Sequence, residues 1–283
     1  MSPFSILRYL RHGPLQEIGW LWIQLGRLYR FIIIHMRLHF PVSHCIGPYG
    51  PFNVSAEFGF SDFANWGKGH NRGFIKCIEA CRHKTCVLDI GAHIGLVTMP
   101  MSKAISPSGQ VVAFEPSSAN REALKRHLSL NSVKNVTVVD NLIGDEVQDH
   151  VPFYESSGVS GMNSCTPFKS GENYKKVSRP QTTIDEFCLR HNLSPEIIKI
   201  DVEGWELSVL EGSTQVLKTS RPIVFLSVHP KHLHSLGRQP SELWSFLYEL
   251  DYKISDISGD TVKSFKLDEY ILEPKQENAA FHP

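Results

Sequence analysis

The sequence lacks an apolar stretch long enough to cross a lipid bilayer. A membrane-spanning helix needs about 20 consecutive apolar residues, and the longest early run without a charge, Ile18 to Gly26, is far shorter. The start of the chain also lacks the small-residue cleavage site that follows the apolar core of a secretory signal. We therefore expect a cytoplasmic protein whose only contact with a membrane is peripheral.

Net charge is also lacking, because 29 lysines and arginines balance 29 aspartates and glutamates. Proteins that bind nucleic acid through general electrostatic attraction carry a basic excess. We therefore expect no nucleic-acid partner. The 283 residues, 41% of them hydrophobic, suffice for one large domain or two small ones.

Cysteines are few for this length, with six in the chain. This number does not form the dense disulfide framework of a small secreted domain, so we expect free thiols. Cys77, Cys81 and Cys86 follow a C-x3-C-x4-C spacing. That spacing differs from the C-x3-C-x2-C of radical enzymes that hold an iron–sulfur cluster. We interpret these thiols as small buried hydrophobes.

Residues 1–45 differ from the rest of the chain and form a predicted N-terminal arm, followed by one domain over residues 46–283. Apolar side chains recur there at three- and four-residue steps, the period of a helical face: Leu15, Ile18, Trp22, Leu25, Tyr29, Ile32, Met36 and Phe40. The arm contains one acid, Glu17, and five arginines: Arg8, Arg11, Arg27, Arg30 and Arg37. Such a basic amphipathic helix can lie on a membrane surface. The alternative is a helix that packs on the domain or on another subunit, and the oligomeric state stays open.

Glycines and prolines interrupt residues 41–73, which predicts an irregular segment. Its aromatic residues have two interpretations, either a lid over a ligand crevice or a seal beneath a sheet: Phe58, Phe60, Phe63 and Trp66.

A glycine turn follows the first apolar run of the predicted domain, in the stretch VLDIGAHIG over residues 87–95. Gly91, Ala92 and Gly95 lie where a buried strand would turn into a helix, and Asp89 precedes them. Glycine permits the sharp turn and a close approach of the backbone to a ligand. The turn lacks the first glycine pair of G-x-G-x-x-G, which approaches the pyrophosphate of a dinucleotide. The motif therefore favours S-adenosylmethionine, which has no phosphate, over NAD.

An acid ends the next apolar run. Glu115 follows residues 111–114, twenty residues after Gly95, a spacing that suits a carboxylate bound to the ribose hydroxyls of a nucleoside. Asp140, Asn141 and Asp145 follow the third run, residues 136–139, where they can meet an adenine amino group. Ordinary turn chemistry is the alternative for these three.

A second informative stretch is IIKIDVEGWE, over residues 197–206. Lys199 and Asp201 share one face of the predicted strand because side chains alternate along it. Asp201 and Glu203 lie at its carboxyl end, the edge where open α/β sheets bind ligands. His229 follows the next run, residues 222–226, at the same edge. A structural salt bridge is the alternative for Lys199 and Asp201.

The remaining patterns complete an α/β domain. Ser117 is predicted to cap a helix over residues 119–130, and residues 151–170 are predicted to form a hairpin over the crevice. Thr183 to Glu186 matches a capping box at the start of a short helix. Further strands are expected at residues 252–257 and 270–272, and a helix at residues 241–250.

Four segments together resemble the FkbM-type methyltransferases: VLDIGAHIGLVT, VVAFEPSSANREALKRHLSLN, TTIDEF and IIKIDVEGWELSVLEGS. The resemblance covers roughly residues 85–230 and implies a Rossmann-like, doubly wound, mostly parallel seven-stranded sheet. It also implies S-adenosylmethionine as cofactor and a hydroxyl of a sugar, glycolipid, polyketide or similar molecule as acceptor. By motif position Asp89, Gly91, Gly95 and Glu115 match cofactor residues, and Asp201 and Glu203 match the acidic pair. The family commonly has a glutamate at the position of Ser227.

Methyl transfer to a hydroxyl needs a group that takes the acceptor proton. The candidates for that base are His229 and Asp201, with Glu203 and Lys199 orienting the acceptor. We expect a neutral His229 to take the proton while Asp201 aligns the hydroxyl. Without a perturbed pKa, activity would rise through about pH 6.5. Asp201, Glu203 and His229 can alternatively ligate a divalent metal, although we expect none. An NAD(P)-dependent oxidoreductase and a non-catalytic adapter are the alternative functions.

Overall fold

The computed structural model describes residues 10–11, 13, 17–69, 71–161, 163–165 and 174–275. Arg8 and Leu15 of the predicted arm lie outside these ranges, as do residues 166–170 of the predicted hairpin.

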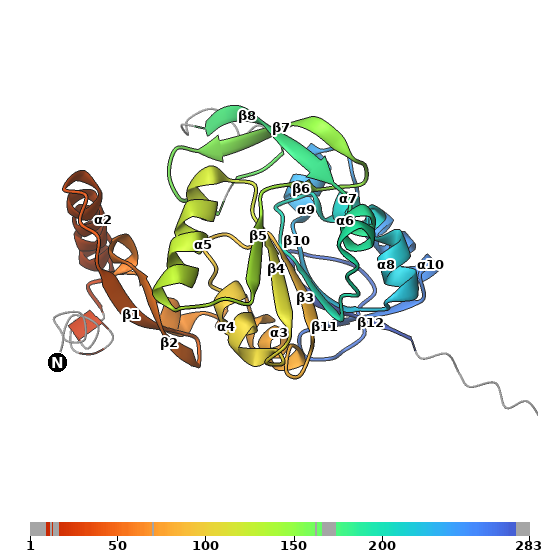
Figure 1. The fold of residues 1–283 in the computed structure, drawn as a ribbon, viewed down its shortest axis with the longest axis horizontal. Helices are drawn as coiled ribbons and strands as arrows, with labels where there is room; N and C mark the ends of the chain where they lie inside the picture. The colour runs from red at the N-terminus through yellow and green to blue at the C-terminus, as the bar shows by residue number, and fades with distance from the viewer. Residues whose placement is uncertain are drawn as a thin grey trace, which may run out of the picture.

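A seven-stranded sheet forms the centre of the protein (Figure 1), in the order β11-β12-β10-β9-β3-β4-β5. Its strands are β3 (Cys86–Ile90), β4 (Gln110–Phe114), β5 (Val136–Val139), β9 (Ile197–Ile200), β10 (Ile223–Val228), β11 (Tyr252–Asp256) and β12 (Asp268–Pro274). Strand β12 runs antiparallel to both of its neighbours, β10 and β11, and the other pairs of this sheet are parallel. Strands buried on both faces read as continuous apolar runs. The predicted mostly parallel sheet is therefore confirmed.

Helices cover both faces of this sheet (Figure 1). One core cluster joins it to α3 (Phe74–Ala80), α4 (Thr98–Ala104) and α5 (Ser118–Leu130). The other joins it to α6 (Ile184–His191), α7 (Glu206–Glu211), α8 (Thr214–Thr219), α9 (Pro230–Ser235) and α10 (Pro240–Glu249). The chain switches from one face to the other between the central strands β3 and β9. Ligands of open α/β sheets bind at the carboxyl ends of the strands beside such a switch point.

Two helix starts test the capping predictions. Thr183 caps α6, because its hydroxyl accepts the backbone N–H of Glu186. Ser117 precedes α5 but makes no capping hydrogen bond through its side chain, so that prediction is wrong. Its backbone N–H instead donates to the Glu115 carboxylate.

A three-stranded sheet lies above the ends of the central strands, in the order β6-β8-β7 (Figure 1). It contains β6 (Leu142–Ile143), β7 (Gln148–Ser156) and β8 (Tyr174–Thr182), and β7 pairs antiparallel with β8. A hairpin is therefore present as predicted, but its second strand begins at Tyr174, beyond the predicted residues 151–170. Ser160, Gly161 and Asn163, which follow β7, line the site described below.

The N-terminal region combines a helix with a β-hairpin. Helix α2 (Gly19–His35) packs beside η1 (Ala56–Phe58), and η2 (Phe63–Asn65) contacts the hairpin. Strands β1 (Pro41–Ile46) and β2 (Tyr49–Ser55) pair antiparallel, so the irregular structure predicted for residues 41–73 is wrong for this part. Burial alternates along β1, with Val42, His44 and Ile46 inward. This period-2 pattern is the strand signal that the prolines and glycines obscured. None of the helices in the described ranges is long and apolar enough to cross a membrane.

Candidate active site

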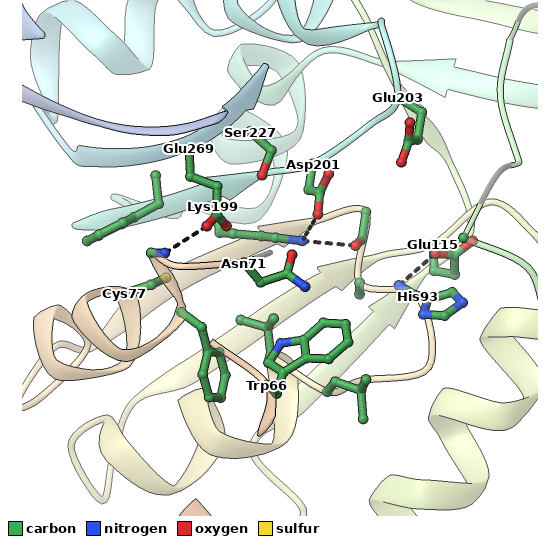
Figure 2. A pocket seen from close by; sticks show the side chains of 18 of the residues that line it. Trp66, Asn71, Cys77, His93, Glu115, Lys199, Asp201, Glu203, Ser227 and Glu269 are labelled. Carbon is green, nitrogen blue, oxygen red and sulfur yellow. Dashed lines mark hydrogen bonds and ion pairs between the residues drawn. The ribbon is translucent and has the colours of Figure 1, made fainter. Parts of the chain in front are cut away.

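A cavity of about 210 Å³ opens at the carboxyl ends of β3, β4 and β9. Glu115 lies at one end of it and Glu269 at the other, with Lys199 and Asp201 between them (Figure 2). Trp66, Asn71 and Gly73 complete the wall opposite the sheet. Phe58 and Phe63 instead belong to the core cluster, so the aromatic segment contributes both to a cavity wall and to a buried seal.

The turn after β3 accepts only glycine at its first position. Gly91 has a φ of +83°, and a Cβ atom built there would lie 1.9 Å from the Asp201 carbonyl oxygen. The backbone N–H groups of Gly91 and Ala92 both donate to the Phe114 carbonyl. The turn is thereby fixed between β4 and β9, and both residues line the cavity. Backbone packed this closely suits a ligand that must approach the strand ends.

Glu115 points into the cavity from the end of β4, as predicted. Its Oε2 accepts the His93 backbone N–H at 2.7 Å, and its Oε1 accepts the Ser117 N–H at 2.9 Å. Burial raises the pKa of Glu115 to about 7, although these donors, Asn120 and Arg121 oppose the shift. The carboxylate is oriented by backbone and only 5% exposed. An acid held in this way can accept the hydroxyls of a ribose.

Lys199 bridges two carboxylates inside the site. Its Nζ lies 3.4 Å from Asp89 Oδ1 and 3.7 Å from Asp201 Oδ2, and it donates to the Gly91 carbonyl at 3.1 Å (Figure 2). Burial alone would lower the pKa of Lys199, but Asp89 and Asp201 raise it above its usual range. The buried lysine is therefore a paired cation, and its predicted position on the face of Asp201 is confirmed.

A second cavity, of about 510 Å³, adjoins the first. Asp201, Glu203 and Ser227 line both cavities, and His229 lines the second. Residues 197–206, with their acids, and His229 after residues 222–226 therefore converge where the cavities meet.

Three carboxylates surround His229. Its Nδ1 lies 2.7 Å from Glu206 Oε1, and its Nε2 lies 3.6 Å from Glu203 Oε1 and 3.8 Å from Asp201 Oδ1. Burial alone would lower the pKa of His229, but the bond to Glu206 and the other two charges raise it to about 9. At neutral pH this imidazole is therefore protonated on both nitrogens and positively charged. The expectation of a neutral His229 that titrates near its ordinary pKa is wrong.

Glu203 takes up a backbone conformation that is uncommon outside glycine, with a φ of +49°. Its Oε2 lies 3.0 Å from His232 Nδ1, and its Oε1 faces His229. Burial, together with Asp201 and Glu206, raises the pKa of Glu203 to about 7, although His229 opposes the shift. Backbone and side chain together aim this carboxylate at the junction of the cavities.

Three predicted cofactor residues do not line the main cavity. Asp89 lies beneath it, fully buried, where it accepts the Thr98 hydroxyl and pairs with Lys199. Gly95 allows close packing, since a Cβ there would lie 2.5 Å from Leu124 Cδ1. Asp145 lines a separate cavity beside Trp205, so its predicted contact with adenine is not supported.

Several residues of the site were not predicted. Asn120, Ser160 and Asn163 line the cavity near Glu115. Glu206 is fully buried and accepts hydrogen bonds from His229 and from the Gly204 N–H. The sequence signal that could have identified it is an acid at the start of a helix whose next residues are mostly apolar.

Glu269 also lines the cavity, and no sequence signal singled it out. It faces Ser227 in the β10–β12 register, so it brings a carboxylate beside the position where the family commonly has one. Its Oε2 also accepts the Gly73 N–H, which ties the wall to β12.

A small apolar cavity of about 60 Å³ lies at the ends of β4 and β5 and shares Gly91 with the main cavity. Its lining includes Phe114, Pro116, Asn141, Leu142, Val202 and Trp205. Asn141, one of the three residues predicted near adenine, is therefore next to a space suited to a flat, largely apolar ring.

The cysteines agree with their predicted interpretation. All six are free, and Cys77, Cys81 and Cys86 are buried. Burial raises the pKa of Cys86 to about 11, so this thiol stays protonated at neutral pH.

The strand order and the position of the site define a Rossmann-like, class I methyltransferase fold. The family model of the FkbM methyltransferase domain matches residues 89–254. This chain belongs to the FkbM methyltransferase family, whose cofactor is S-adenosylmethionine. Gly91 and Glu115 fit that cofactor, because one permits close approach and the other presents an oriented carboxylate. No curated protein matches the chain.

Solved methyltransferase structures are similar at low identity. The FkbM methyltransferase from Methylobacillus flagellatus has 16% identity and a TM-score of 0.43, over 77% of this chain and 54% of that one. The chain thus spans about half the length of that protein. M. jannaschii TYW2, solved with AdoMet, has 12% identity and a TM-score of 0.42, over 83% of this chain and 84% of that one. A putative rRNA methylase from Clostridium thermocellum has 9% identity and a TM-score of 0.43, over 73% and 96%. The expected absence of a nucleic-acid partner stays a prediction.

Proposed function

We propose that this protein transfers a methyl group from S-adenosylmethionine to a hydroxyl of a sugar, glycolipid, polyketide or similar small molecule. One observation carries the proposal: Asp201 and Glu203 line both the main cavity and the cavity beside it. A donor in the first cavity and an acceptor in the second would meet at these two carboxylates.

The residues that would hold the cofactor follow from their positions. Glu115 would accept the ribose hydroxyls, and Asn141 would meet adenine in the small apolar cavity. Gly91, at the boundary of both cavities, would let the cofactor pass close to the backbone. Hydrogen bonds from neutral hydroxyls to a carboxylate contribute about 1.5–3 kcal/mol.

When bound, the cofactor supplies an activated methyl group, whose S–C bond breaks as the O–C bond forms. The chain must align the acceptor oxygen and take its proton. Asp201 is the proposed proton acceptor, held in place by Lys199 and facing the acceptor cavity. Glu203 and His229 would orient the acceptor. Alignment can lower the barrier by several kcal/mol, and a positioned base contributes about 10²- to 10⁴-fold in rate.

The two alternative functions have less support. An NAD(P)-dependent oxidoreductase conflicts with membership in a methyltransferase family. A non-catalytic adapter would have no use for the buried Asp89–Lys199–Asp201 cluster. Burying these charges costs desolvation free energy that an apolar core would avoid.

Transfer of a labelled methyl group tests the proposed reaction. The protein is incubated with methyl-labelled S-adenosylmethionine and a panel of sugars, glycolipids and polyketides, and mass spectrometry locates the label. We expect label on a hydroxyl oxygen, as a methyl ether. Label on a nitrogen or carbon atom, or on an RNA added to the same panel, would contradict the assignment of a hydroxyl acceptor.

We also propose that α2 binds the surface of an anionic membrane. Trp22 and Ile33 are buried on its inner face, and Tyr29 donates to the Ala56 carbonyl. Its other face exposes large apolar side chains by 55% or more: Trp20, Ile23, Leu28, Phe31 and Ile34. The helix lies at the edge of the molecule (Figure 1).

Charge favours a lipid surface as the occupant of this face. No acid occurs between Glu17 and Glu57, whereas this segment contains three arginines: Arg27, Arg30 and Arg37. Each basic residue near an anionic leaflet contributes about 1 kcal/mol. Apolar side chains on one face of a basic helix can enter the interface.

Flotation with vesicles tests the α2 face. We expect the full chain to float with phosphatidylserine-containing vesicles at low salt. The double variant Trp20→Ser, Phe31→Ser should lose this binding, because each buried apolar side chain contributes about 1.5–3 kcal/mol. Leu189→Ser is the matched control, since Leu189 is 80% exposed on α6. Failure of the full chain to float would contradict membrane binding and favour the alternative, a helix that packs on the domain or on another subunit.

A further inference from the structure

Three metal-ligating side chains converge where the two cavities meet. One ligand atom from each of Asp201, Glu203 and His229 lies within 4.8 Å of the others. The Nε2–oxygen distances are 3.6 and 3.8 Å, too long for hydrogen bonds. A cation about 2.1 Å from each ligand separates neighbouring ligand atoms by about 3.0 Å and opposite ones by about 4.2 Å. Across the described ranges, no other three such side chains converge in this way.

Glu206 supplies a second, independent sign of metal chemistry. It is fully buried, and its Oε1 accepts from His229 Nδ1 at 2.7 Å. Histidines that bind metals usually donate their other ring N–H to a carboxylate, which fixes the ring and leaves the second nitrogen free for the metal. Here that second nitrogen, Nε2, faces Asp201 and Glu203.

Negative charge exceeds positive charge in this cluster. Four carboxylates meet here, none with more than 29% of its side chain exposed: Asp89, Asp201, Glu203 and Glu206. Lys199 pairs with two of them and His229 contacts three, so the four carboxylates outnumber these two cationic partners even when His229 is counted as charged. Buried charges that lack partners are costly. A divalent cation would offset most of this excess.

We propose that Asp201, Glu203 and His229 bind one divalent cation of the Mg²⁺ or Mn²⁺ class at the junction of the two cavities. Two carboxylate oxygens beside one imidazole nitrogen suit these ions. The role of the cation rests on the proposed function: it would hold the acceptor oxygen as a Lewis acid beside the methyl donor. Its binding is a property of this chain that can be measured without an acceptor.

Electron paramagnetic resonance with Mn²⁺ as the probe tests the site on the full chain at pH 8, where protons compete less with the metal. We expect one Mn²⁺ per chain in the wild type. Glu203→Gln should weaken binding at least tenfold, and Glu206→Gln, which changes only a positioning residue, by about 10- to 100-fold. Glu249→Gln, a change at an exposed carboxylate of α10, should bind as the wild type does.

Binding of S-adenosylhomocysteine to the same variants separates this proposal from the proposed function. Absence of saturable Mn²⁺ binding, in a protein that still binds S-adenosylhomocysteine, would overturn the metal site and leave the methyltransferase assignment intact. Equal weakening by Glu203→Gln and Glu249→Gln would also overturn it. A fold check by circular dichroism on each variant ensures that lost Mn²⁺ binding reports the ligand.

Discussion

Replacement of Asp201 by asparagine is expected to lower the rate of methyl transfer by about two to four decades, the usual contribution of a positioned base. The amide cannot take the acceptor proton, and the charge opposite Lys199 is lost. Lys199 keeps its contacts with Asp89 and the Gly91 carbonyl, so the fold should survive. Single-turnover kinetics with the acceptor found by methyl labelling measures the effect on the transfer step itself.

Cofactor affinity distinguishes this effect from a collapsed site. S-adenosylhomocysteine should bind Asp201→Asn nearly as well as the wild type, because Glu115, the proposed ribose ligand, lies at one end of the cavity, away from Asp201 (Figure 2). Asp149→Asn, a change at an exposed carboxylate on β7, is the matched control and should keep the wild-type rate. A near-normal rate in Asp201→Asn would remove this residue from the reaction.

Replacement of Glu115 by glutamine should weaken S-adenosylhomocysteine binding by about one to two decades, because charged hydrogen bonds to the ribose are lost. The pH dependence adds a specific signature. Burial raises the pKa of Glu115 to about 7 in the free protein, and the ionised form is the one that accepts two hydroxyls. Affinity should therefore rise as pH rises through 7, by about tenfold between about pH 6 and about pH 8. Isothermal calorimetry measures both effects.

Glu115→Gln also serves as the control for that pH dependence, since glutamine does not titrate and its affinity should stay constant. An equal rise of affinity with pH in wild type and variant would assign the titration to another group. Unchanged affinity in a folded variant would show that Glu115 does not hold the ribose.

The sheet was predictable because its strands are buried on both faces. Residues 86–90 and 197–200 are entirely buried, and such strands appear as short apolar runs that end in a glycine or an acid. The carboxyl ends of parallel strands share one edge. The positions of Glu115, Asp201 and Glu203 at the site therefore followed from the sequence alone.

The sequence was a weaker guide where tertiary contacts decide the outcome. The pKa of His229 depends on Glu206, and the contact between α7 and this residue just after β10 has no signature in sequence spacing. Asp145 follows a predicted strand, but the chain enters β6 before reaching it, and its side chain is placed beside another cavity. The hairpin of β1 and β2 contains Pro41, Gly47 and Pro51, and these residues hid a strand pattern that becomes clear only when burial is known.

The central claim is that the crevice around Glu115 holds S-adenosylmethionine. Thermal denaturation of the wild type with S-adenosylhomocysteine, NAD and NADP in parallel tests it most directly, because a ligand that binds the native state raises apparent stability. The account predicts a higher melting temperature with S-adenosylhomocysteine alone, and a smaller rise in Glu115→Gln. A rise with NAD or NADP, and none with S-adenosylhomocysteine, would contradict it.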